Sequence, residues 1–154
     1  MSGAGSTAIL GEVMNPEERH RHLRASCVEQ GLRLTPQRDV LLRVLSQTTG
    51  HPTAEALIQK VRAVLPSVSQ ATVYRNVQEL VRAGLIGTLE RAGGAVQFEI
   101  NPDTHHHFIC RRCGEVWDVY LDEAQLQPHQ PAGLTDFQID RREVQFHGLC
   151  ASCR

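Results

Sequence analysis

Two pairs of cysteines are the strongest chemical signal in this sequence. Cys110 and Cys113 form one C-x-x-C pair, and Cys150 and Cys153 form a second. Two such pairs in one chain are typical of a tetrahedral zinc site. Because sulfur would occupy all four coordination positions, the site has no place for a substrate. The pattern therefore predicts structural rather than catalytic zinc.

Disulfides and a redox motif are the competing interpretations of these cysteines. We expect no export signal in this sequence, and disulfides are rare in a reducing cytosol. A redox C-x-x-C would not need two copies. The long segment between the pairs must carry structure of its own, with zinc holding its ends together. The fifth cysteine, Cys27, falls in a helical pattern and is expected to be a small buried residue.

A second set of metal-ligand side chains surrounds three consecutive histidines. In a strand, His105 and His107 would face one side and His106 the other. Glu99 precedes them at the end of a predicted hairpin, and Asp118 follows in an alternating run of residues. Imidazole with carboxylate suits Fe²⁺, Mn²⁺ or Zn²⁺, and ligand chemistry alone does not choose among them. A solvated histidine cluster is the alternative.

Charge divides the chain into a basic and an acidic half. Residues 19–92 hold eleven Arg and Lys against five Asp and Glu, whereas residues 93–154 hold five against nine. This division suggests a polyanion-binding module joined to a second domain, although scattered solvated charge would give the same counts. No apolar run approaches the ~20 residues of a membrane-spanning helix. Residues 1–15 are expected to be a flexible tail.

The basic half has the pattern of helices followed by a hairpin. The first helical pattern covers residues 17–30, and Thr35-Pro36 begins a second that reaches about Gln47. His51-Pro52-Thr53 begins a third helix that ends before Pro66, and Ser69 caps a fourth from Gln70 to Ala83. Two strands follow, Ile86–Arg91 and Ala95–Ile100, on either side of the turn Ala92-Gly93-Gly94. This order predicts a winged helix whose recognition helix is the fourth one.

The fourth helix has an apolar side and a polar side. The buried stripe is predicted to be Val73, Val77, Leu80 and Val81, and the outward residues Gln70, Thr72, Arg75, Asn76 and Arg82. Arg75 can bridge a guanine or a phosphate, and the Tyr74 ring can pack on a thymine methyl group. A half-buried Tyr74 and a solvated Arg75 are the alternative. Together with Thr72, these two residues are the candidate DNA contacts.

Four strings of this chain stand in an order that resembles a known family. They are Leu32-Arg33-Leu34-Thr35-Pro36-Gln37-Arg38, His51-Pro52-Thr53-Ala54, Ala71-Thr72-Val73-Tyr74-Arg75, and His105-His106-His107-Phe108-Ile109-Cys110-Arg111-Arg112-Cys113-Gly114. In this order the chain resembles the ferric uptake regulator superfamily of bacterial metal- or peroxide-responsive transcription factors. The likeness covers roughly residues 23–153.

The resemblance implies an α+β protein with two domains. A winged helix-turn-helix DNA-binding domain would cover residues 16–100, a hinge residues 101–104, and a small α/β dimerisation domain with the four-cysteine zinc site residues 105–154. The implied protein is a cytoplasmic homodimer that binds double-stranded DNA at A·T-rich inverted repeats and has no membrane partner. Arg33 would probe the minor groove of such a site.

The resemblance also implies a regulatory metal site. The family's ligand positions map onto His51, Glu99, His105, His107 and Asp118. Mn²⁺ or Fe²⁺ would bind there, with Zn²⁺ as a third option. Zinc-sensing members tend to have Cys at the position of Glu99 and peroxide sensors Asp, so Glu99 favours the iron- or manganese-responsive branches. Asp118, however, is the shorter acid of the peroxide branch.

A third metal site found in many members is less well matched. His106 replaces an acid of that site, and Arg142 stands where a later histidine would be, which leaves His106 and Glu123 as its candidates. The sequence thus predicts a repressor of metal-homeostasis genes that responds to iron or manganese. A peroxide-sensing or zinc-uptake regulator of the same superfamily is the alternative.

Two hypotheses from other classes remain open. Two histidines with carboxylates could form the centre of a metal-dependent hydrolase, but no separate base, oxyanion donors or phosphate-binding loop stand out. A DNA-binding protein with a structural zinc site and no regulatory metal site would bind DNA regardless of added metal. The sequence favours a regulator that is not an enzyme.

Overall fold

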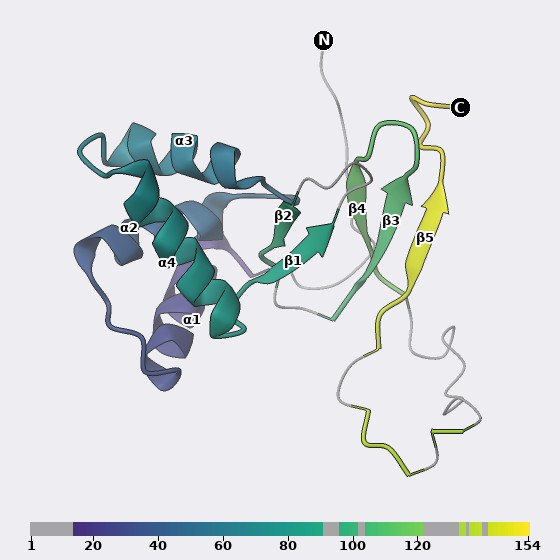
Figure 1. Cartoon of the computed structure of the whole chain (residues 1–154), viewed down its shortest axis with the longest axis horizontal. Coiled ribbons are helices and arrows are strands. Elements are labelled where there is room, and N and C mark those ends of the chain that lie inside the picture. The colour runs from purple at the N-terminus through teal and green to yellow at the C-terminus, as the bar shows by residue number, and fades with distance from the viewer. Residues whose placement is uncertain (1–13, 91–95, 102–103, 122–132, 135, 140–141) are drawn as a thin grey trace. The chain divides into compact units, whose positions relative to one another are not determined.

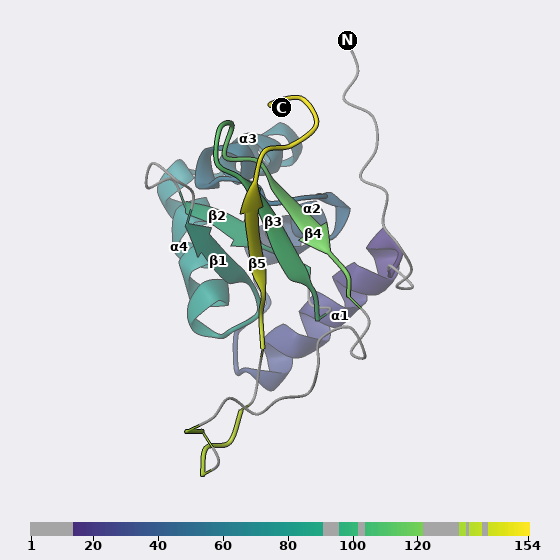
Figure 2. The same ribbon diagram turned by 90° about the vertical axis from the view of Figure 1, so that its right-hand side faces the viewer.

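The structure, a computed structural model of the 154-residue chain, describes residues 14–90, 96–101, 104–121, 133–134, 136–139 and 142–154. The described residues form two compact units, one on each side of residues 102–103 (Figures 1 and 2). Nearly all of the tail predicted for residues 1–15 lies outside the described residues. So do Glu123 and the turn Ala92-Gly93-Gly94.

Four helices begin the first unit. They are α1 (Pro16–Glu29), α2 (Pro36–Gln47), α3 (Ala54–Val64) and α4 (Gln70–Arg82), as Figure 1 shows. Each follows a polar N-cap residue, namely Asn15, Thr35, Thr53 and Ser69, whose side chain accepts a hydrogen bond from a backbone N–H of the first turn. These bounds confirm the four predicted helices.

The first unit is built on one apolar core. The α4 stripe contributes Val73, Val77 and Leu80, and α2 contributes Leu41, Leu42 and Leu45. Cys27 of α1 is fully buried in the same cluster, as predicted. Burial of these side chains removes apolar surface from water and is the main stabilisation of the helical bundle.

A two-stranded hairpin follows α4. Strands β1 (Gly87–Glu90) and β2 (Val96–Glu99) pair antiparallel, and Phe98 of β2 is buried in the helical core. The backbone N–H of Phe98 donates to the carbonyl of Pro52 at 2.9 Å, which ties β2 to the start of α3. Helices and hairpin in this arrangement confirm the predicted winged helix.

The second unit is a three-stranded sheet in the order β4-β3-β5. Strand β3 (His106–Cys110) pairs antiparallel with β4 (Val116–Val119) and parallel with β5 (Gln145–Gly148). Figure 2 shows β3 between its two neighbours. The described residues of this unit contain no helix, and residues 122–132 lie outside the description. No described helix of the chain is both long and apolar enough to cross a bilayer.

Candidate metal centres and DNA-binding surface

The four predicted zinc ligands come together in the second unit. The Sγ atoms of Cys110, Cys113, Cys150 and Cys153 all lie within 4.8 Å of one another, and those of Cys113 and Cys150 are 3.8 Å apart. None of the four is part of a disulfide. The cluster fits a tetrahedral zinc ion with four sulfur ligands.

Strand pairing explains why two distant C-x-x-C motifs meet. Each motif begins where a strand ends, and the parallel register sets Cys110 opposite Gly148, two residues before Cys150. Both motifs therefore lie at the same end of the sheet, where β3 and β5 end. Gly114, at φ +71°, adopts a left-handed conformation that closes the first turn, and its N–H donates to the Cys110 carbonyl at 2.8 Å.

Hydrogen bonds within the cluster shift the thiol pKa values in opposite directions. Backbone hydrogen bonds, first from Cys113 and next from Cys150, lower the pKa of the Cys110 thiol to about 6. Hydrogen bonding to neighbouring thiols, first to Cys150, raises the pKa of Cys153 to about 12. The four sulfurs therefore do not all ionise at neutral pH by themselves, whereas a divalent ion would balance the charge of four thiolates.

Three predicted regulatory ligands also converge in the second unit. The Nε2 atoms of His105 and His107 lie 3.0 Å apart, and a carboxylate oxygen of Asp118 lies 3.8 Å from the Nε2 of His105. The antiparallel register sets His107 directly opposite Asp118. The three atoms form one face of a coordination sphere of nitrogen and oxygen.

Glu143 is a neighbour of this group that sequence reasoning missed. Its Oε1 lies 2.9 Å from the Nδ1 of His107, whereas the other ring nitrogen, Nε2, is the one that faces His105. Metal-binding histidines commonly donate their second ring N–H to a carboxylate, which fixes the tautomer and the ring orientation. Glu143 precedes β5, and only the parallel pairing of β5 with β3 could have indicated its place.

His106 has a different environment. Its Nδ1 accepts a hydrogen bond from the backbone N–H of Val144 at 3.1 Å. All three histidines of the string are buried, so the solvated-cluster alternative is wrong. The third metal site stays a prediction, because Glu123 lies outside the described residues.

The remaining two predicted ligands meet in the first unit. The Nε2 of His51 lies 2.8 Å from the Oε2 of Glu99, which joins the loop before α3 to the end of β2. The Oε1 of Glu99 accepts a hydrogen bond from the backbone N–H of Asn101 at 2.6 Å. Gly87 pairs with Glu99 in the hairpin, and a Cβ at Gly87 would lie 3.1 Å from the Glu99 Cβ. Glycine at this position therefore leaves room for the carboxylate.

Candidate DNA contacts lie on the exposed side of α4 and in the loop before α2. Tyr74 is 51% exposed, and Arg75 and Arg33 are exposed as well. Thr72 is half-buried, and its Oγ1 lies 2.8 Å from the Oγ of the N-cap residue Ser69. Because Tyr74 and Arg75 are exposed, their side chains can contact a partner.

Asn76 does not lie on that outward side, and this prediction is wrong. Its Oδ1 accepts a hydrogen bond from the Nε of Arg38 at 3.1 Å, and its Nδ2 donates to the Thr72 carbonyl at 2.8 Å. A buried guanidinium group requires acceptors on every side. That requirement turns Asn76 inward, although the helical period alone places it outward.

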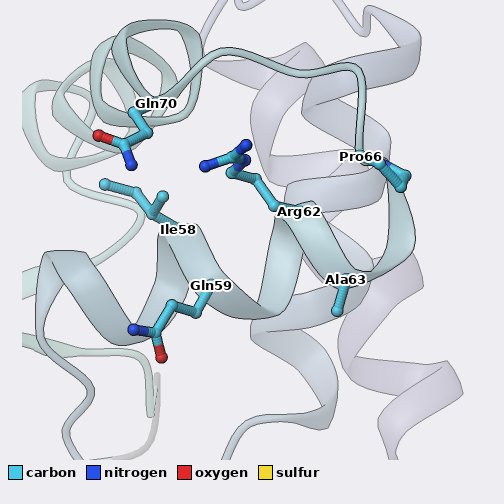
Figure 3. A pocket seen from close by; sticks show the side chains of 6 residues that line it. All are labelled: Ile58, Gln59, Arg62, Ala63, Pro66 and Gln70. Carbon is cyan, nitrogen blue, oxygen red and sulfur yellow. The ribbon is translucent and has the colours of Figure 1, made fainter.

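A hollow of about 350 Å³ lies between α3 and the start of α4. Its walls are Ile58, Gln59, Arg62, Ala63, Pro66 and Gln70. Figure 3 shows the side chains of Arg62 and Gln70 on the two sides of this space. Arg62 is the one charged residue of the lining, so the hollow adds positive charge beside the first residue of α4.

Comparison with known proteins defines the class to which this fold and these sites belong. Residues 29–147 match the Ferric uptake regulator family. A peroxide-responsive repressor PerR from Staphylococcus epidermidis is 33% identical over 134 residues, which are 84% of this chain and 87% of that protein. The chain therefore belongs to the ferric uptake regulator family.

Solved structures give the same fold. The ferric uptake regulator Fur of Helicobacter pylori matches with a TM-score of 0.72 over 94% of this chain and 97% of that one, at 21% identity. A zinc uptake regulator in complex with zinc and DNA matches with a TM-score of 0.59 at 26% identity, over 91% of this chain and 95% of that one.

Family membership decides between the classes of function. This protein is a metal-dependent, DNA-binding regulator of transcription and not an enzyme, so the hydrolase hypothesis is wrong. The cysteine cluster indicates a structural zinc site, and the histidine and carboxylate ligands indicate a regulatory metal.

Proposed function

We propose that this protein is a cytoplasmic homodimeric repressor in which one regulatory ion takes ligands from both units. His51 and Glu99 would come from the first unit, and His105, His107 and Asp118 from the second. The convergence of two Nε2 atoms and one carboxylate oxygen in the second unit is the main support. Three such ligands leave coordination positions that the pair in the first unit would fill.

In this proposal residues 101–104 act as a hinge whose angle the ion fixes. Two α4 helices of a dimer must enter successive major grooves about 34–36 Å apart. An ion that selects the matching angle raises DNA affinity without touching DNA. A two-fold symmetric dimer also accounts for an inverted repeat as the target, with Arg33 in an A·T-rich minor groove.

Major-groove contacts are assigned to Thr72, Tyr74 and Arg75. The DNA used in the tests, called the selected duplex, is the one that the Mn²⁺-loaded protein selects from a random-sequence pool. Changing Tyr74 or Arg75 to Ala is expected to weaken binding to the selected duplex. Loss of one base contact costs ~1–3 kcal/mol, which is roughly 5- to 150-fold in affinity. Fluorescence anisotropy measures this change.

Arg82→Ala, at the far end of α4, is the control, because it removes the same charge from the same helix. Both test variants should keep the dimer mass and one zinc per chain. If both bound the selected duplex as tightly as the wild type, α4 would not be the helix that reads DNA.

The signal sensed by the protein is the finer part of the proposal. The name of the peroxide-responsive relative favours peroxide sensing over a response to iron or manganese supply alone. Glu99 is the feature that favours the iron- or manganese-responsive branches instead. All five ligands offer nitrogen or oxygen, which suits either Fe²⁺ or Mn²⁺. Zn²⁺ would also bind in vitro, because intrinsic affinity rises along the Irving–Williams order.

Treatment with hydrogen peroxide tests this assignment. Fe²⁺ held by the five proposed ligands would supply a one-electron reductant for peroxide, and the ligand side chains would be the groups open to oxidation, whereas Mn²⁺ would not supply this chemistry. We expect peroxide to weaken binding of the Fe²⁺-loaded protein to the selected duplex by roughly tenfold or more. The Mn²⁺-loaded protein should be unaffected. Retention of DNA binding by both forms would instead support a metal-responsive repressor that does not sense peroxide.

A further inference from the structure

Arg38 is a buried arginine at the centre of the DNA-binding unit. It lies in the first turn of α2 and is 6% exposed. Its backbone N–H donates to the Oγ1 of the N-cap residue Thr35 at 3.2 Å. Its side chain is too deeply buried to be an ordinary surface charge, and arginine is rarely buried without partners.

The guanidinium group of Arg38 bonds in three directions. Nη1 donates to the backbone carbonyl of Arg33 at 2.5 Å, Nε donates to the Oδ1 of Asn76 at 3.1 Å, and Nη2 pairs with the carboxylate of Glu79. Asn76 in turn donates to the carbonyl of Thr72 at 2.8 Å. One side chain of α2 thus holds the loop before α2 and two successive turns of α4.

The residues that this network connects belong to the two candidate reading elements. The Arg33 side chain is exposed and is assigned to the minor groove, while its own carbonyl is held by Arg38. Thr72 belongs to the turn of α4 assigned to the major groove. The network therefore connects, through the interior of the DNA-binding unit, two elements that would contact DNA at its surface.

We propose that Arg38 is a positioning residue that sets the distance between the Arg33 loop and α4. The Arg33 loop would then be ordered before DNA binds, so that the minor-groove and major-groove contacts form together. This inference rests on the proposed DNA contacts of Arg33 and α4. Arg38 itself, being buried, does not contact DNA.

Only arginine has the geometry for this role. Its planar guanidinium group offers five N–H donors in a fixed fork, whereas lysine offers one compact ammonium group on a flexible chain. A lysine at this position keeps the charge but does not reach the Arg33 carbonyl, Asn76 and Glu79 together. Ordering the Arg33 loop would then cost conformational entropy at the moment of DNA binding.

A double-mutant cycle tests the proposal in the full-length, Mn²⁺-loaded protein with the selected duplex. In the wild-type background, Arg33→Ala should weaken binding on the order of tenfold. In the Arg38→Lys background, the same change should have less than about a twofold effect, because the loop is no longer held in place. Equal effects of Arg33→Ala in both backgrounds would overturn the proposal.

Binding to an unrelated duplex separates positioning from general damage. Arg38→Lys should weaken binding to the selected duplex on the order of tenfold and change binding to the unrelated duplex less than about twofold. A merely destabilised fold would lower both affinities and would count against the proposal. Arg43→Lys is the matched control, since this residue lies on the same helix and pairs with Glu17 at 3.6 Å, outside the network. It should change neither affinity.

A second variant covers the case in which Arg38→Lys does not fold. Glu79→Ala removes a half-buried anchor on α4 and leaves Arg38 in place. It should reduce the effect of Arg33→Ala in the same way, and an undiminished effect would overturn the proposal. If Arg33→Ala had no effect even in the wild type, the proposed minor-groove contact would itself be wrong, which distinguishes the two failures.

Discussion

Cys113→Ser is expected to release the structural zinc and to unfold the second unit while the helices of the first unit remain. Structural zinc contributes about 10–16 kcal/mol of apparent binding free energy at pH 7, which is comparable to the whole stability of a typical domain. The described residues of the second unit form three short strands, and zinc would hold the ends of two of them together. The first unit has its own apolar core.

Native mass spectrometry, zinc release to a chromogenic chelator and far-ultraviolet circular dichroism measure these effects on one preparation. The variant should lose zinc and dimer mass but keep most of its helical signal. Cys27→Ser is the control, because it makes the same chemical change at a buried cysteine that is not a ligand. That variant should melt at a lower temperature and keep its zinc. A Cys113→Ser protein that retained one zinc per chain would show that the four sulfurs are not the zinc site.

His105→Ala and His107→Ala are expected to have the opposite profile. Each removes one of the two converging Nε2 atoms and leaves the cysteine cluster untouched. Both variants should remain zinc-containing dimers. Added Mn²⁺ should raise their affinity for the selected duplex by less than about twofold, whereas coupling in the wild type should be roughly 5- to 150-fold.

Two other histidines serve as controls for these variants. His147 is exposed on β5, and His147→Ala should leave both stability and metal response unchanged. His106→Ala should lower thermal stability, because it leaves the Val144 N–H without its acceptor. It should still respond to Mn²⁺. Full metal response in both His105→Ala and His107→Ala would place the regulatory site elsewhere.

Local signals made the first unit largely predictable. Thr35, Thr53 and Ser69 each cap a helix through a bond to a neighbouring residue, so their positions can be found from short strings of sequence. The C-x-x-C pairs were equally clear, because zinc chemistry fixes both the residue type and the spacing.

Features that depend on distant pairing were not predictable. Glu143 reaches His107 only because β5 lies parallel to β3. Asn76 turns inward because it satisfies the buried Arg38, a residue far from it in sequence. Gly87 matters because it stands opposite Glu99 in the hairpin. Each of these contacts joins elements whose pairing is set by the whole fold rather than by local propensity.

The choice of signal was not fixed by ligand identity either. Glu99 favoured iron or manganese responsiveness, whereas the peroxide-responsive relative favours the alternative. The five proposed ligands of this chain offer only nitrogen and oxygen, which suit Fe²⁺ and Mn²⁺ alike, so their chemistry does not separate the two signals.

Reciprocal linkage between metal and DNA is the most direct test of a regulatory ion that couples to DNA binding. The affinity of the chelator-treated protein for the selected duplex is measured with and without Mn²⁺, and its affinity for Mn²⁺ is measured with and without the duplex. The two ratios should be equal and well above one, because coupling between two ligands is symmetric. DNA affinity that did not change with Mn²⁺, together with Mn²⁺ affinity that did not change with DNA, would contradict the account and leave a zinc-stapled DNA-binding protein without metal sensing.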